Sequence, residues 1–394
     1  MGVNGLKKLL REKSVRAFFS LSINKFRQTR IAIDANNLMY ANMATAQKDI
    51  IRNTDILMEA PSSVAIRRRW IDGILNFTFR WLRYDITPVF VFDGPPNPLK
   101  METCKNRREQ RTKNKQEIDE LQTKVQDDLL SVSNEEIDKL RTKMNNNVNI
   151  TSEDMSDIIA ILKSIGIPCI MAPDDAEKLC SMLCYQGLVS AVFSKDADCI
   201  GFNSPLIITE YSHETEKDAL GIKHPKLECI RLDHLLDDVK FTINQMIDLI
   251  ILLGCDYNTS TPNSRPIYGY GPKKCFNLIE KYQSIDDFPE SIPIHKLKHI
   301  ISREQFKHDE IPEDLKLDLS EIDISIVTML FSSFNLTHRL HEYTNILKTF
   351  NPGNSQTVID LTPIKEYTPE KSRFVQDITI IDGEKIVSKH IDFL

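Results

Sequence analysis

The stretch VFSKDADCIGF, residues 192–202, places Asp196 and Asp198 one residue apart, directly after an apolar run typical of a buried strand. Two carboxylates in partly dry surroundings repel, and each raises the pKa of the other unless a positive charge lies between them. In an extended segment residues i and i+2 face the same side, so the two side chains can share one site. The pair indicates either a metal site or, since Asp is common in turns, a solvated turn.

Short apolar runs alternate with helix-like segments around this stretch, which is typical of a parallel sheet with crossover helices. The runs expected as strands are RIAID (30–34), TPVFVFDG (87–94), IPCIM (167–171), LVSAVFS (188–194) and PLIIT (205–209). Apolar residues at helical spacing occur in 70–84, 151–166 and 242–257. An α/β fold, with a twisted, mostly parallel sheet flanked by helices, is predicted.

The composition is that of a soluble globular protein, with 41% hydrophobic and 27% charged residues in 394. No stretch approaches the roughly 18 to 20 apolar residues of a membrane span, and the N-terminus lacks a signal-peptide core. We therefore expect an intracellular protein that is not secreted. The eight cysteines include no C-x-x-C pair, so neither a zinc site nor a disulfide framework is indicated.

The net charge of −6 excludes a uniformly basic nucleic-acid coat protein, but basic residues cluster locally. One cluster comprises Lys100, Lys105, Arg107, Arg108, Arg111, Lys113 and Lys115. The charged stretch 100–150 carries only a sparse apolar stripe of Ile118, Leu121, Val125 and Leu129. Such a segment predicts one or two helices projecting from the body, with a short coiled coil or disorder as the alternative.

Acidic residues follow most of the expected strands, and a further one closes the helix 242–257. They are Asp34, Asp93, Asp175, Glu177, Asp196, Asp198 and Asp256. Each alone could be a turn or capping residue, but the carboxyl ends of parallel strands meet at one edge of a sheet. Oxygen ligands without His or Cys favour Mg²⁺ or Mn²⁺, and two such ions about 4 Å apart can activate a water for phosphodiester cleavage. The basic stretch 100–115 could then attract a polyanion.

Several motifs resemble the XPG-type structure-specific 5′ nucleases, most closely the flap endonucleases. They are MGVNGLKKLL, IAIDANNLMY, VFVFDGPPNPLK, GIPCIMAPDDAEKLC, VFSKDADCIGF, LLGCDYN and IYGYGPKKCFNLI, between Met1 and Lys281. The resemblance implies a PIN-like 5′ nuclease fold with a projecting helical arch and a helix-two-turn-helix. It implies two Mg²⁺ ions, replaceable by Mn²⁺, on the seven acids named above.

The resemblance also implies roles for residues outside the acidic set. Lys100 and Arg107 correspond to basic gateway residues at the scissile phosphate, Tyr40 to an aromatic that stacks on a terminal base, and Gly2 to a small residue beside the active site. GYGPKK corresponds to a hairpin that binds uncut duplex, through Gly269, Gly271, Lys273 and Lys274, with K⁺ at 268–271.

The chain departs from the family pattern at four places. The family has Glu where Asp175 stands, and DGPPNP lacks the lysine often found after Asp-Gly. Asp256 and Gly269 are 13 positions apart, more than is usual, which puts the hairpin geometry in doubt. Near the C-terminus KHIDFL is a poor sliding-clamp peptide, so clamp binding is doubtful.

The expected regions are 1–108 (N-terminal nuclease region), 109–150 (arch), 151–256 (internal nuclease region), 257–290 (helix-two-turn-helix), 291–350 (C-terminal helices) and 351–394 (polar tail). The leading hypothesis is a monomeric nuclease of the nucleus that cuts 5′ flaps of branched DNA near the junction, in replication, repair or recombination. The alternatives are a 5′→3′ exonuclease on nicked DNA or RNA, and a non-catalytic scaffold that binds nucleic acid.

Overall fold

The structure is a computed structural model that describes residues 3, 5–127, 133–258, 266–312, 315–351, 374–375 and 390–391. Three expectations fall outside these residues: Gly2, Leu129 of the apolar stripe, and most of the polar tail. Among the described residues, no helix is both long and apolar enough to cross a membrane.

Seven strands form one sheet in the order β1-β7-β6-β5-β2-β3-β4. Their bounds are β1 Phe18–Ser22, β2 Arg30–Asp34, β3 Thr87–Phe92, β4 Cys169–Met171, β5 Ala191–Phe193, β6 Leu206–Lys217 and β7 Lys223–Arg231. A separate two-stranded pair is formed by β8 Phe374–Val375 and β9 His390–Ile391. The pairs β6-β5, β5-β2, β2-β3 and β3-β4 are parallel, and only β7 runs against its neighbours. The predicted mostly parallel sheet is confirmed.

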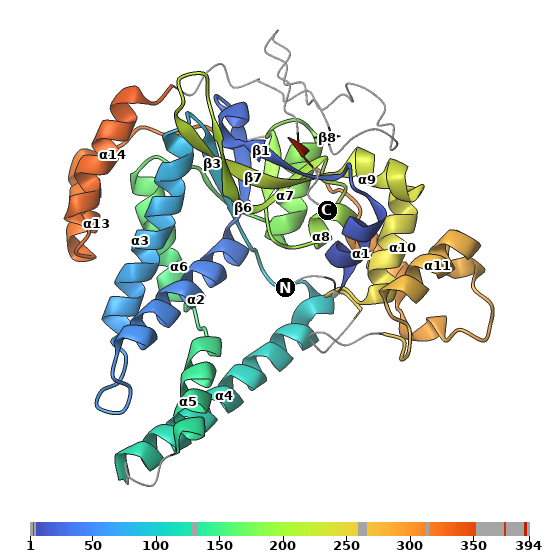
Figure 1. The fold of residues 1–394 in the computed structure, drawn as a ribbon, viewed down its shortest axis with the longest axis horizontal. Coiled ribbons are helices and arrows are strands. Elements are labelled where there is room, and N and C mark those ends of the chain that lie inside the picture. Colours follow the sequence, from blue (N-terminus) through green and yellow to red (C-terminus); the bar gives the residue numbers. More distant parts are fainter. Residues whose placement is uncertain are drawn as a thin grey trace.

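Helices cover both faces of the sheet (Figure 1). They are α1 Leu6–Lys13, α2 Ala35–Asn53, α3 Ser63–Leu82, α4 Met101–Asp127, α5 Asn134–Asn146, α6 Ser152–Ser164, α7 Ala176–Tyr185, α8 Asp198–Gly201, α9 Leu232–Val239, α10 Ile243–Leu253, α11 Pro272–Tyr282, α12 His299–Gln305, α13 Ile324–Ser333 and α14 Thr337–Thr349. Side chains of the central strands alternate between two cores: Val89 and Val91 face the layer that includes α7 and α10, while Phe90 and Phe92 face the layer that includes α3 and α6. This alternation explains why the central strands are apolar throughout.

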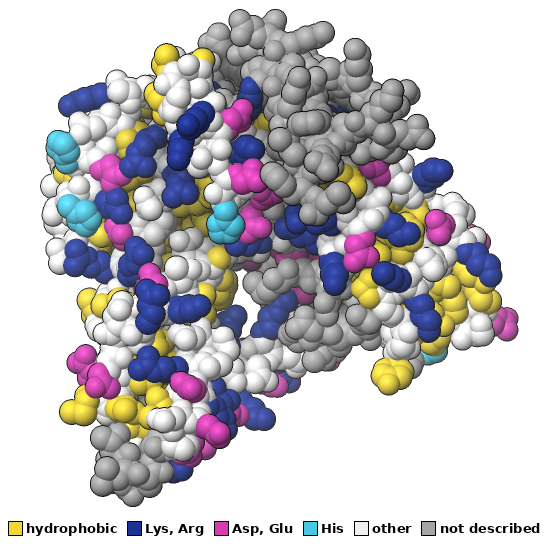
Figure 2. All heavy atoms as spheres, viewed as in Figure 1, with side chains coloured by type: hydrophobic (Ala, Val, Ile, Leu, Met, Phe, Trp, Pro, Cys, Tyr) yellow, Lys and Arg dark blue, Asp and Glu magenta, His cyan; other side chains and the backbone are white. Residues whose placement is uncertain are grey.

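The two helices α4 and α5 project from the body as an arm, which we call the arch (Figure 1). Of its apolar stripe, Ile118 and Val125 of α4 are buried, because they pack with Leu140 of α5, with Ile51 in the last turn of α2 and with Ile56 just beyond it. Ion pairs from Lys124 to Glu136 (2.5 Å) and from Lys143 to Glu117 join the two helices. In Figure 2 the background shows through an opening between the body and the arch, with Lys and Arg side chains around it.

Candidate functional site

Four adjacent strands carry the predicted acids to one edge of the sheet. Asp34 ends β2, Asp93 follows β3, Asp175 precedes α7 after β4, and Asp196 follows β5. The side chain of Asp34 also caps α2, accepting from the N–H of Asn37 at 3.1 Å. Because β5, β2, β3 and β4 are parallel neighbours, their carboxyl ends lie side by side.

The loops after β3 and β4 are in direct contact, which brings Asp93 towards Asp175. The N–H of Gly94 donates to the carbonyl of Asp174 at 2.7 Å. A Cβ at Gly94 would lie 2.1 Å from the carbonyl oxygen of Ala172, so only glycine permits this approach. The N–H of Ala176 then donates to Asp93 at 2.9 Å.

Burial and mutual repulsion raise the pKa of the central carboxyls. Asp34 is 2% exposed, and its pKa rises to about 7, first through burial and further through Asp93 and Asp196. Burial also raises the pKa of Asp198 well above its usual range, with added repulsion from Asp196 and Asp256. The acids therefore lie close enough to disfavour each other's ionised form, which a cation between them would reverse.

The donor set fits a hard divalent cation. Oxygen Oδ1 of Asp198 is buried and finds no hydrogen-bond partner among the described residues, although a buried polar atom normally has one. Buried carboxylate oxygens of this kind are the ligands that Mg²⁺ and Mn²⁺ take. Among the described residues, no three His, Cys, Asp or Glu side chains are arranged so that they could coordinate one metal ion together as they stand. Several carboxylates face protein donors instead: Asp34 accepts from Ser194 (2.7 Å), and Asp93 from Asn36.

Lys100 lies inside the acidic centre. Its Nζ is 2.8 Å from Oδ1 of Asp175 and 4.7 Å from the centre of the Tyr257 ring. Burial alone lowers the pKa of Lys100, but the charges of Glu177 and Asp175 outweigh burial and hold this pKa above its usual range. Lys100 is therefore a fixed cation at the site.

Arg107 stands on the first turns of α4, where the arch joins the body. Its guanidinium is 2.9 Å and 3.0 Å from the two oxygens of Asp256, which follows α10. The predicted gateway pair thus meets the predicted acids. The assignment of Lys100 and Arg107 as groups that contact substrate stays a prediction.

The remaining predicted contact residues that the structure describes lie on α2 and in the hairpin before α11. Tyr40 is on α2, with the guanidinium carbon of Arg111 5.4 Å from its ring centre. Gly271 caps α11, Lys274 donates to the carbonyl of Gly269 at 3.3 Å, and Lys273 lies 3.5 Å from Glu12 of α1. Part of the long connection before this hairpin lies outside the described residues.

Three residues of the centre were not predicted as site residues from the sequence: Asn36, Ser194 and Tyr257. Asn36 and Ser194 are polar residues next to strand ends, and each bonds an acid of the neighbouring strand. Tyr257 donates to Oδ2 of Asp175 at 2.6 Å, across 82 residues of chain. The adjacency of Tyr257 to Asp256 in GCDY was the one available signal for it.

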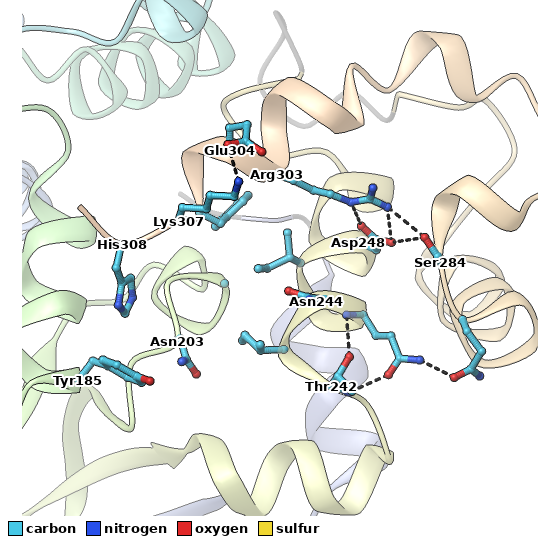
Figure 3. Close-up of a pocket in the computed structure, with 16 residues that line it drawn as sticks. Tyr185, Asn203, Thr242, Asn244, Asp248, Ser284, Arg303, Glu304, Lys307 and His308 are labelled. Carbon is cyan, nitrogen blue, oxygen red and sulfur yellow. Dashed lines mark hydrogen bonds and ion pairs between the residues drawn. The ribbon is translucent and has the colours of Figure 1, made fainter. Parts of the chain in front are cut away.

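A cavity of about 830 Å³ lies at the other end of α7 and α10 from the acids (Figure 3). It is lined by Tyr185 at the end of α7 and by Thr242, which caps α10. Its strong charges are paired: Arg303 with Asp248 at 2.6 Å, and Lys307 with Glu304 at 2.7 Å. The acidic centre, with its buried and mutually repelling carboxyls, remains the candidate site.

The fold and this centre define the class: an α/β protein of the PIN-like nuclease fold with a buried acidic centre. Residues 1–114 match the XPG N-terminal domain, and residues 166–256 match the XPG I-region. The chain belongs to the XPG family of 5′ nucleases, together with the flap endonucleases.

Similar proteins agree with this membership. Flap endonuclease 1 of Cryptosporidium muris is 30% identical over 411 residues, covering 100% of this chain and 82% of that protein. Flap endonuclease 1 of Encephalitozoon cuniculi is 31% identical, covering 72% of this chain and 74% of that protein.

Solved structures share the fold. The catalytic core of Rad2 in complex with DNA substrate matches at a TM-score of 0.58, with 18% identity, over 89% of this chain and 100% of that chain. Flap endonuclease-1 from Methanococcus jannaschii matches at 0.57, with 22% identity, over 85% of this chain and 97% of that chain.

Proposed function

We propose that this protein is a divalent-metal-dependent, structure-specific endonuclease that cuts 5′ flaps of branched DNA near the junction, in replication, repair or recombination. The observation that carries the proposal is the buried acidic centre with Lys100 and Arg107 in contact with it, where the basic stretch 100–115 begins the arch. The relatives named flap endonuclease 1 support the substrate class.

Two groups of residues would act at the scissile phosphate, one binding metal ions and the other binding the phosphate. The metal ligands would be Asp34, Asp93, Asp175, Glu177, Asp196, Asp198 and Asp256, holding two Mg²⁺ ions, with Mn²⁺ as a substitute. Ions held there would supply Lewis-acid chemistry at the phosphodiester. Lys100 and Arg107 would bind the phosphate and stabilise the charge that develops on it.

Asp175 would be oriented for this task by two neighbours. Lys100 is 2.8 Å from one of its oxygens and Tyr257 bonds the other at 2.6 Å, so the carboxylate cannot rotate without losing a contact. Asp175 is one methylene shorter than the family's Glu, and this clamp would hold it in a reproducible position.

The DNA on either side of the cut would be held away from the acids. Tyr40 would stack on a terminal base, and Gly2 would lie beside the active site. Main-chain groups of Gly269 and Gly271, with Lys273 and Lys274, would bind uncut duplex, with K⁺ at 268–271. We further propose a monomer that acts in the nucleus.

The test is cleavage of a double-labelled 5′-flap duplex in Mg²⁺ or EDTA, beside the variant Asp198→Asn and a nicked duplex. Cutting at the junction that needs the metal and Asp198 is the expected result. A preference for the nicked duplex, with stepwise products, would indicate the exonuclease instead. Tight binding without cleavage in Mg²⁺ or Mn²⁺ would replace both with a scaffold.

A further inference from the structure

A smaller cavity, of about 240 Å³, lies between α2, α3 and β6, outside the acidic centre. The helices α2 and α3 pack side by side (Figure 1). The residues used below are Asn42 and Thr45 of α2, Arg69, Asn76 and Arg80 of α3, and Tyr211 of β6. Thr45 and Asn76 are exposed, so the cavity opens to solvent.

Arg80 gives this cavity an uncompensated positive charge. Its guanidinium carbon is 4.5 Å from the ring centre of Tyr211, and no carboxylate in the described part of the chain pairs with it. Arg69 differs, since it contacts Asp49 at 3.1 Å and Asp72 at 3.6 Å. A cation without a carboxylate partner, among hydroxyl and amide groups, is the chemistry of an anion site.

The absence of a side chain at Gly73 keeps the cavity open. A Cβ at Gly73 would lie 3.0 Å from Oδ1 of Asn42, so glycine leaves room at the floor between the helices.

We propose that this cavity binds a backbone phosphate of the DNA substrate, with Arg80 as its cationic ligand and Asn42, Thr45 and Asn76 as hydrogen-bonding neighbours. This proposal rests on the proposed nuclease function, which supplies the polyanion. A phosphate needs only a small part of the available volume. Sequence-independent contacts of this kind position DNA without reading its bases.

The position of the cavity along α2 gives its distance from the acidic centre, where the DNA would be cut. Asn42 and Ala46 are 8 and 12 residues beyond Asp34, so at about 1.5 Å of rise per residue the cavity lies about 12–18 Å along the helix from the acidic centre. Phosphates of one strand follow each other every ~3.4 Å along the duplex axis. The contacted phosphate should therefore lie about four to five nucleotides from the scissile one.

The test compares Arg80→Gln with Arg83→Gln. Arg83 carries the same charge one turn further along α3 but pairs with Glu342. Binding of a fluorescent 5′-flap duplex is measured in Ca²⁺ over a range of salt concentrations. We expect Arg80→Gln to bind about tenfold more weakly at low salt, with a salt slope smaller by about 0.9, since one phosphate contact is lost.

Two further variants guard against misfolding. Arg80→Lys keeps the charge and should keep the salt slope, and Asn76→Asp places a negative charge at the exposed rim and should weaken binding. A methylphosphonate scan should find one linkage whose neutralisation weakens the wild type but not Arg80→Gln. Equal affinity and slope in Arg80→Gln and the wild type, or an equal loss in Arg83→Gln, would overturn the cavity site alone. A wild type that neither binds nor cuts flap DNA would overturn the proposed function as well.

Discussion

Tyr257 and Asp175, 82 residues apart in the chain, are joined by a hydrogen bond of 2.6 Å between the tyrosine hydroxyl and Oδ2 of the carboxylate. The ring of Tyr257 also lies 4.7 Å from Nζ of Lys100, which binds the other oxygen of Asp175. One buried aromatic side chain therefore contacts both a carboxylate and a cation of the candidate centre.

Replacing Tyr257 by Phe should weaken the centre without unfolding it. The ring and its contact with Lys100 remain, but a hydrogen bond to a charged group, worth ~1.5–3 kcal/mol, is lost. We expect the Mg²⁺ concentration for half-maximal cleavage to rise about tenfold, while flap affinity in EDTA is unchanged. Tyr282→Phe removes a hydroxyl elsewhere and serves as control. An unchanged Mg²⁺ requirement in Tyr257→Phe would contradict this role.

Asp198→Asn should separate folding stability from metal binding. Burial and the charges of Asp196 and Asp256 raise the pKa of Asp198, so a neutral amide removes repulsion. We expect the thermal midpoint in EDTA to rise, the added stabilisation by Mg²⁺ to shrink, and cleavage to fall by about a hundredfold or more. Thermal unfolding with and without Mg²⁺ checks the first two. A lower midpoint in EDTA would show that the ionised Asp198 stabilises the fold.

Leu140→Ala should loosen the arch. Leu140 is 1% exposed between α4, α5 and the end of α2, and truncation of a buried leucine costs about 2–5 kcal/mol. Since this cluster is separate from the two main cores, hydrogen exchange should speed up in α4 and α5 while the body keeps its protection. Leu220→Ala, at an 85% exposed position, is the control. Equal protection of the arch in both variants would argue against the cluster as its anchor.

His234 should make the fold less stable in acid. Burial, with the nearby charge of Arg231, lowers the pKa of His234 below 6.5. The unfolded chain then takes up the proton more readily, so the stability that His234 contributes is present above about pH 6.5 and is lost as the pH falls. Denaturant unfolding from pH 7.5 to 5 should show this loss. The loss should be smaller in His234→Asn and unchanged in the exposed variant His338→Asn; an identical slope in all three proteins would exclude His234 as its source.

Much of the sheet could be predicted because its strands are buried on both faces. The runs around β2, β3 and β5 are apolar throughout, and they end in the acids that the structure brings together. The strands β1 and β7 were not predicted. β7 contains Pro225 and several polar residues, and its strand conformation depends on antiparallel pairing with β6 and β1.

The α/β architecture, the family and the acids at the strand ends can be predicted from the sequence alone, because periodicity and motif spacing are local properties of the chain. The partners of those acids follow from the tertiary fold. Arg107 meets Asp256 across 149 residues and Ser194 meets Asp34 across 160. Likewise, the packing of α3 on α2 and β6 leaves Arg80 without a carboxylate partner in the described part of the chain. Such contacts depend on packing between distant elements, which no local pattern records.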